Sequence, residues 1–117
     1  IEGSSTAGSA SYTVRVGQYT KIGRVVQFSC YVVWSGGTGT GSLRIAGLPF
    51  ATATQILNCP SAYVENVTLS ANYIAIASMS ANSTNINMDQ IPVGGGTALG
   101  VNYDATGNIF VTGTYTI

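Results

Sequence analysis

The sequence contains no histidine and few charged residues. Lys and Arg number 4, Asp and Glu number 4, and charged residues make up 7% of the 117 residues, so the net charge is zero. Because histidine is the commonest general base and a frequent metal ligand, its absence excludes a Ser-His-Asp triad and any zinc site that needs imidazole. The chain also lacks the basic patch that nucleic acids and anionic membrane surfaces require, so neither is an expected partner.

Acid-base chemistry would depend on Glu2, Glu65, Asp89 and Asp104 alone. A glycosidase needs two carboxyl groups within about 5–9.5 Å, one of them with a raised pKa. The three acids beyond residue 10 fall in separate loops or strands of the predicted fold. We therefore expect no enzyme activity, no catalytic residues, no metal site and no cofactor.

Cysteine is scarce, and long apolar runs are absent. Cys30 and Cys59 are too few for a disulfide framework. Cys30 lies in an apolar face and is expected to be a buried reduced thiol, although a bridge to Cys59 remains an alternative. No apolar run approaches the ~18 residues of a transmembrane helix, so membrane insertion is not expected.

The residues that are abundant indicate β-structure. Val, Ile and Thr account for 35 of the 117 residues, and these β-branched types fit a pleated sheet better than a helix. Residues 1–10 are small and polar, which predicts a linker, and residues 11–117 predict a single antiparallel β-sandwich domain. We expect up to nine strands, near residues 11–16, 19–22, 25–34, 42–46, 62–69, 72–78, 85–88, 97–103 and 108–117.

Short connections separate the predicted strands. Gly23-Arg24 suits a two-residue hairpin, since Gly supplies a positive φ. Asp104–Gly107 is expected to close a second hairpin, and Ser70–Asn72 a third short connection. The segment Pro49–Pro60 predicts one irregular turn.

Two predicted strands carry apolar residues on both faces. In residues 25–34 the even positions form one apolar face, and Val25, Tyr31 and Val33 lie on the other. Residues 72–78 likewise have Ile74 and Ile76 on one face and Tyr73, Ala75 and Ala77 on the other. Such strands would leave an apolar patch exposed in a monomer, so we expect the chain to form an oligomer.

Two stretches resemble the distal, C-terminal domain of bacteriophage tail fibres and tailspikes. One is a Gly-x-Tyr-Thr-Lys-Ile-Gly hairpin, which begins at Gly17, and the other is the Ile-x-Gly-Leu-Pro-Phe element of residues 45–50. A Tyr-Val-x-Asn-Val-Thr-Leu run and a Thr-Gly-Thr-Tyr ending extend the resemblance over residues 11–117. Leu48 and Phe50 are expected to plug one end of the sandwich, because Pro49 cannot donate to a strand ladder.

The resemblance implies a jelly-roll-like, homotrimeric β-sandwich at the tip of an adhesin in the virion. Such a domain is extracellular, binds bacterial surface glycan and attaches the phage to its host. Two alternatives are a purely structural module that trimerises or caps the fibre, and a bacterial secreted lectin-like domain.

Carbohydrate sites combine an aromatic ring with amide or carboxylate groups that bind hydroxyls. The first candidate is Trp34, although its shared face with Phe28 and Val32 favours a core position. The second is Asn102, Tyr103 and Asp104 at a predicted hairpin tip, where the alternative for Tyr103 is a place in the core. Glu65 is expected at a strand edge or in an ion pair with a basic residue such as Arg44.

Overall fold

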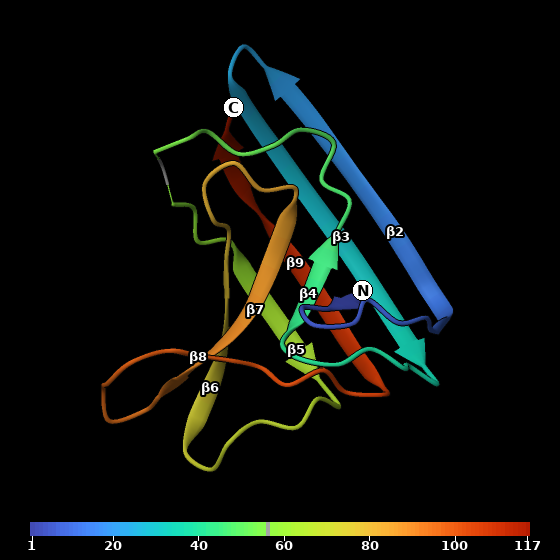
Figure 1. Ribbon diagram of the computed structural model, residues 1–117. Coiled ribbons are helices and arrows are strands. Elements are labelled where there is room, and N and C mark those ends of the chain that lie inside the picture. Colours follow the sequence, from blue (N-terminus) through green and yellow to red (C-terminus); the bar gives the residue numbers. More distant parts are fainter. Residues whose placement is uncertain (56) are drawn as a thin grey trace.

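The computed structural model describes residues 1–55 and 57–117, and every regular element in them is a β-strand. Two antiparallel sheets pack against each other (Figure 1), which confirms the predicted all-β sandwich. No helix in the described residues is both long enough and apolar enough to span a membrane.

The four-stranded sheet contains the longest strands. Its order is β2 (Ser11–Ile22), β3 (Val25–Ser35), β9 (Gly107–Thr116) and β5 (Ser61–Glu65). The predicted strands 11–16 and 19–22 are one continuous strand, β2, with a bulge between Tyr12 and Val14. The β2–β3 turn is the predicted two-residue hairpin, because Ile22 pairs with Val25 and Gly23 has a φ of 59°.

The five-stranded sheet covers the other side of the core. Its order is β1 (Glu2–Gly3), β4 (Leu43–Ala46), β7 (Asn85–Pro92) and β6 (Tyr73–Ser78), and β8 (Leu99–Gly100) also pairs with β7. Residues 1–10, predicted as a linker, therefore contain a strand: Glu2 pairs with Arg44, and their side chains form an ion pair of 2.7 Å. Composition alone gave no sign of this pairing, because a two-residue strand has no periodicity.

The core forms between the inward faces of the two sheets. The even-numbered face of β3 and the odd-numbered face of β9 point inward, as the alternation predicts. The tyrosine hydroxyl of Tyr115 donates to the Phe50 carbonyl at 3.2 Å, and its ring meets Phe28 edge to face. The buried residues of the core are Val26, Phe28, Val32, Trp34, Leu43, Ile45, Ala77, Met79, Ile86, Met88, Val101, Ile109, Val111 and Tyr115.

One predicted connection is wrong in its topology. The segment after β8 does not form a hairpin at Asp104–Gly107, because β8 pairs with β7 and β9 pairs with β3 and β5. Ser70–Asn72 does lie in a connection between two strands, which runs from β5 in one sheet to β6 in the other. The predicted strand 62–69 ends at Glu65, since Asn66 adopts a φ of 57° that interrupts the extended backbone.

The segment that follows β4 packs on the end of the core. Leu48 and Phe50 are half-buried against core residues, which confirms the predicted end plug. The predicted irregular turn of residues 49–60 contains no named strand in its described residues, and Ile56 lies outside them. This segment closes the sandwich near the C-terminal end of β9, since the Ala53 amide donates to the Thr116 carbonyl.

Candidate functional site

Trp34 is a core residue and not a surface ring. Its side chain is 2% exposed and lies over Gly107, where an added Cβ would come within 2.2 Å of the indole. The indole N–H donates to the Asp104 carbonyl at 3.0 Å. The prediction that Trp34 binds carbohydrate is therefore corrected: the inward parity of β3 buries the ring.

Tyr103 is held by the loop that precedes β4 and does not form an exposed platform. Added Cβ atoms at Gly37 and Gly39 would each lie 2.5 Å from the Tyr103 ring or its hydroxyl, so the backbone packs directly against the side chain. The hydroxyl oxygen is buried, and the Tyr103 amide donates to the Gly41 carbonyl. The predicted partly exposed ring is thus a half-buried anchor for a glycine-rich loop.

Asp104 is also engaged within the fold, whereas Asn102 is exposed. The Asp104 carboxylate accepts a hydrogen bond of 2.9 Å from the Thr68 amide, and this bond lowers the pKa of the carboxyl group. Its role is to hold the segment after β5 against the segment before β9. Asn102, Tyr103 and Asp104 are adjacent in sequence, but the Tyr103 hydroxyl is buried and the Asp104 carboxylate binds the Thr68 amide.

A different set of aromatic side chains lies in the open, on the outer face of the four-stranded sheet. The strand register places Val16 opposite Tyr31, Tyr31 opposite Phe110, and Phe110 opposite Tyr63. These four residues form one row across all four strands, which we name the aromatic row. They are 62%, 37%, 41% and 56% exposed, and the Tyr31 and Phe110 rings lie 6.2 Å apart.

Hydrogen-bonding side chains flank the aromatic row on one side. Asn108 and Glu65 are paired in the register, and the Asn108 amide donates to the Glu65 carboxylate at 3.3 Å. The Tyr63 hydroxyl donates to the same carboxylate, and this hydrogen bond raises the pKa of Tyr63. Glu65 lies on the edge strand β5, which agrees with the first of its two expected positions, and the alternative ion pair with Arg44 is wrong because Arg44 pairs with Glu2.

On its other side the aromatic row borders a shallow polar hollow of about 290 Å³. Gln18, Ser29 and Thr112 follow one another across three strands, and the Gln18 amide donates to the Ser29 hydroxyl at 3.3 Å. The hollow continues to Thr20 and Gln27 along the β2–β3 hairpin. Rings, amides, hydroxyls and one carboxylate therefore share a single exposed sheet face.

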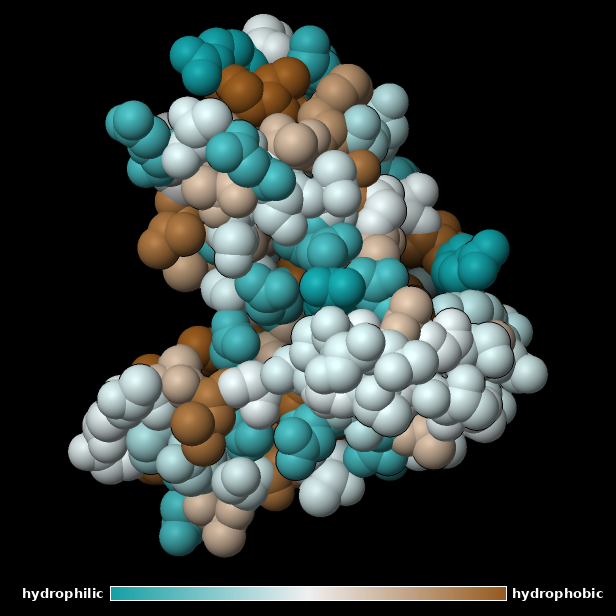
Figure 2. Space-filling model, in the orientation of Figure 1, coloured by the Kyte–Doolittle hydropathy of each residue, from teal (hydrophilic) through white to brown (hydrophobic). Residues whose placement is uncertain are grey.

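This face could be found from the sequence only in part. The alternation shows that Tyr31 and Phe110 each point away from the core. Their strands are separated by more than seventy residues, so only the β3–β9 register reveals that the rings are neighbours. The view in Figure 2 faces the other side of the molecule, where brown apolar residues are interspersed with pale and teal ones.

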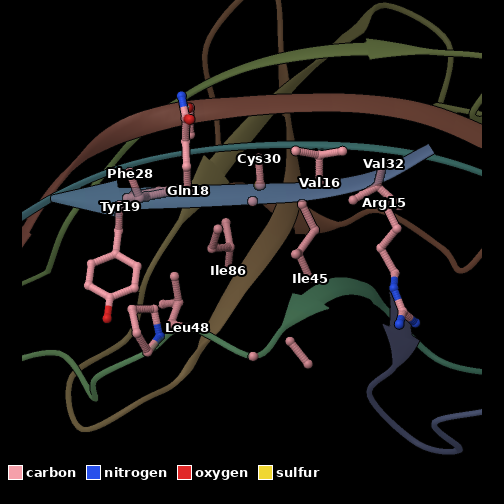
Figure 3. Close-up of a pocket in the computed structure, with 15 residues that line it drawn as sticks. Arg15, Val16, Gln18, Tyr19, Phe28, Cys30, Val32, Ile45, Leu48 and Ile86 are labelled. Carbon is pink, nitrogen blue, oxygen red and sulfur yellow. The ribbon is translucent and has the colours of Figure 1, made fainter.

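A second hollow lies on the inner side of β2 (Figure 3). It is a cleft of about 320 Å³ between β2 and β3 on one side and β4 with residues 47–49 on the other. Its lining is mostly apolar, and Ile45, Leu48 and Ile86 lie beneath the strand. Tyr19 points into the cleft at one end, and the Arg15 side chain borders the other.

The carboxylates of the described residues are dispersed over the molecule. Glu2 pairs with Arg44, Asp89 accepts from the Ser78 hydroxyl at 2.5 Å, and Glu65 and Asp104 have the partners given above. The described part of the chain contains no group of three or more His, Cys, Asp or Glu side chains that could hold a metal ion.

Comparisons of the chain with known protein families, with curated proteins and with solved structures find no match. The aromatic row and its polar borders are therefore the features on which a functional proposal rests.

Proposed function

We propose that this β-sandwich binds carbohydrate on the outer face of its four-stranded sheet. The observation that supports the proposal is the aromatic row, which places Tyr31, Phe110 and Tyr63 on one exposed surface between two bands of hydrogen-bonding side chains. An aromatic ring can cover the apolar face of a pyranose, while amides, hydroxyls and a carboxylate bind its hydroxyl groups.

The chemistry of this face favours a neutral sugar chain. Its ionisable groups are Glu65 and the tyrosine hydroxyls, and the face has no basic side chain in the register of the aromatic row. The Glu65 carboxylate is oriented by Tyr63 and Asn108, so its remaining acceptor capacity has a fixed direction. An extended, shallow surface suits several consecutive sugar units better than a single enclosed one.

The resemblance to tail fibres suggests where such binding would take place. At the tip of a phage tail fibre or tailspike, this face would meet host surface glycan during attachment. Single contacts of this kind are weak, but display of three copies raises the overall avidity by about 10²–10⁴ without new contacts.

A glycan array with alanine variants tests the proposal. We expect Phe110→Ala and Tyr63→Ala to lower binding at least about tenfold, since each removes a ring from the row. Leu57→Ala is the matched control, because Leu57 is an exposed apolar residue in the segment before β5, outside the strands of this face. Binding that survives both ring substitutions, or that falls equally with Leu57→Ala, would contradict the proposed face.

Self-association is the second proposed property, and another surface favours it. Ile74, Ile76 and Ile91 form an apolar patch on the outer face of β6 and β7, where Ile74 pairs with Ile91 and is 52% exposed. Burial of this patch between copies would leave the aromatic row free. Light scattering should then give about three times 12.0 kDa, and a stable monomer at micromolar concentration would contradict the trimer.

A further inference from the structure

The strand β2 has a free edge along its whole length. It pairs only with β3, and no strand of the described residues lies on its other side (Figure 1). Strand edges are usually shortened, covered or interrupted by proline, because unpaired N–H and C=O groups accept any extended chain. β2 has twelve residues and no proline, so it presents a long backbone surface for strand addition.

The apolar cleft opens directly beneath this edge. Arg15, Gly17, Tyr19 and Lys21 alternate on the inner side of β2, since they pair with the inward residues of β3. Gly17 is the residue between Arg15 and Tyr19 on this side of the strand, and it has no side chain. A Cβ added there would meet a single atom, the Cys30 Cβ at 3.8 Å. The inner side of β2 therefore has a vacant apolar position at Gly17.

Two positive charges flank that position. Arg15 and Lys21 contact the rings of Tyr12 and Phe50, and neither has a carboxylate partner within residues 1–55 and 57–117. The other basic residues are engaged elsewhere: Arg44 pairs with Glu2, and Arg24 donates to the Ile117 carbonyl. The edge strand thus combines free backbone groups, an apolar cleft and positive charge.

We propose that β2 binds an extended acidic peptide segment, which adds to the four-stranded sheet as a fifth strand. Main-chain hydrogen bonds to the edge supply affinity, and alternate side chains that face the cleft supply specificity. Side chains opposite Arg15 and Lys21 are acidic, and those between them are apolar, so that one enters the cleft at Gly17. The expected motif is acidic-x-apolar-x-apolar-x-acidic, which spans about 20 Å at ~3.3 Å per residue.

Charge disfavours a second copy of β2 as the occupant in the register that aligns the two inner sides about Gln18. Antiparallel pairing of two β2 strands about Gln18 would place Arg15 of one copy opposite Lys21 of the other, and like charges in directly opposed positions are destabilising. An acidic segment meets the same positions with opposite charge. The site lies on the inner side and edge of β2, so it is separate from the aromatic row and goes beyond the proposed carbohydrate function.

A synthetic peptide, Glu-Thr-Leu-Thr-Leu-Thr-Glu, tests the proposal in either strand direction. In fluorescence anisotropy with the labelled peptide, we expect saturable binding that Gly17→Val weakens at least about tenfold, the cost of excluding one buried Leu side chain. Gly17→Val should fold normally, because the added Cβ makes only one ordinary van der Waals contact, with the Cys30 Cβ at 3.8 Å. Gly94→Val is the control, since a Cβ added at Gly94 meets no atom within 4 Å and Gly94 lies in the β7–β8 loop.

Reversal of the two charges on β2 provides a second test of the peptide proposal. The double variant Arg15→Glu with Lys21→Glu should lose the acidic peptide and bind the same peptide with lysine at both ends. Hydrogen exchange should show new protection of β2 amides that face away from β3 when the peptide is bound. The proposal is overturned if Gly17→Val binds like the unmodified protein, if the lysine peptide binds the unmodified protein equally well, or if the protein alone dimerises with β2 already protected. Phe110→Ala leaves this site intact, so failure here is distinguishable from failure of the carbohydrate proposal.

Discussion

Replacement of Phe50 by alanine tests the role of the segment after β4 in closing the sandwich. The Phe50 ring is half-buried against the core and meets the Tyr19 ring edge to face, with centroids 5.7 Å apart. The Lys21 ammonium lies 5.5 Å from the ring centroid. The Phe50 carbonyl also accepts the hydrogen bond from Tyr115, so the residue links the end plug to the core.

The expected loss of stability follows from these contacts. Truncation of a fully buried Phe costs about 3–5 kcal/mol, and partial exposure reduces the burial share to roughly half of that. Loss of the Tyr19 pair adds ~0.5–1.5 kcal/mol, and the exposed Lys21 contact adds little. We expect the free energy of unfolding to fall by about 2–4 kcal/mol, which corresponds to a melting temperature lower by roughly 10 °C.

Urea unfolding followed by Trp34 fluorescence measures this change, because Trp34 is the sole tryptophan and is buried. Leu57→Ala is a suitable control, since Leu57 is exposed and an exposed substitution changes stability by only about 0.5 kcal/mol or less. A Phe50→Ala variant as stable as the control would refute the end-plug interpretation. Carbohydrate binding should be unchanged, because Phe50 lies on the inner side of the sheet.

Two further predictions concern titratable groups. Cys59 is exposed, whereas Cys30 is half-buried and burial raises the pKa of its thiol. A maleimide should therefore modify Cys59 first. Equal rates of modification of the two cysteines, followed by mass spectrometry, would contradict this prediction. The hydrogen bond from the Thr68 amide lowers the pKa of the Asp104 carboxyl group. The charged carboxylate therefore stabilises the fold at pH values above its ordinary pKa of 3.8. This stabilisation is lost as the pH falls below that pKa. Asp104→Asn should therefore cost about 1 kcal/mol at pH 7 and progressively less below pH 4 in urea unfolding, and a pH-independent difference would contradict the role of the charge.

The strands and their inward faces could be predicted from the sequence because both depend on local alternation. Val26, Phe28 and Val32 are buried as the parity of β3 requires, and Thr112 and Thr114 of β9 are exposed. The Gly23 hairpin was also predictable, since the turn and both strands are contiguous. Pairing between distant strands was not predictable in this way, because it depends on register.

The predicted site failed for the same reason. Asn102, Tyr103 and Asp104 were expected at a hairpin tip, but β8 and β9 lie in different sheets, and the connection between them folds against the loop that contains Gly37. The aromatic row, by contrast, could not be recognised from neighbouring residues in the sequence. Its members are far apart in sequence and become neighbours only when the register of β3, β9 and β5 is known.

The most direct test of the carbohydrate proposal maps the ligand onto the protein. A neutral oligosaccharide selected on the glycan array is titrated into isotopically labelled protein, and chemical-shift changes are followed by NMR. We expect the largest changes at Tyr31, Phe110 and Tyr63, with smaller ones at Gln18 and Asn108, while the segment of residues 102–104 and the cleft beneath β2 remain unchanged. Changes confined to residues 102–104 or to the cleft, or the absence of any glycan that binds, would contradict the proposal.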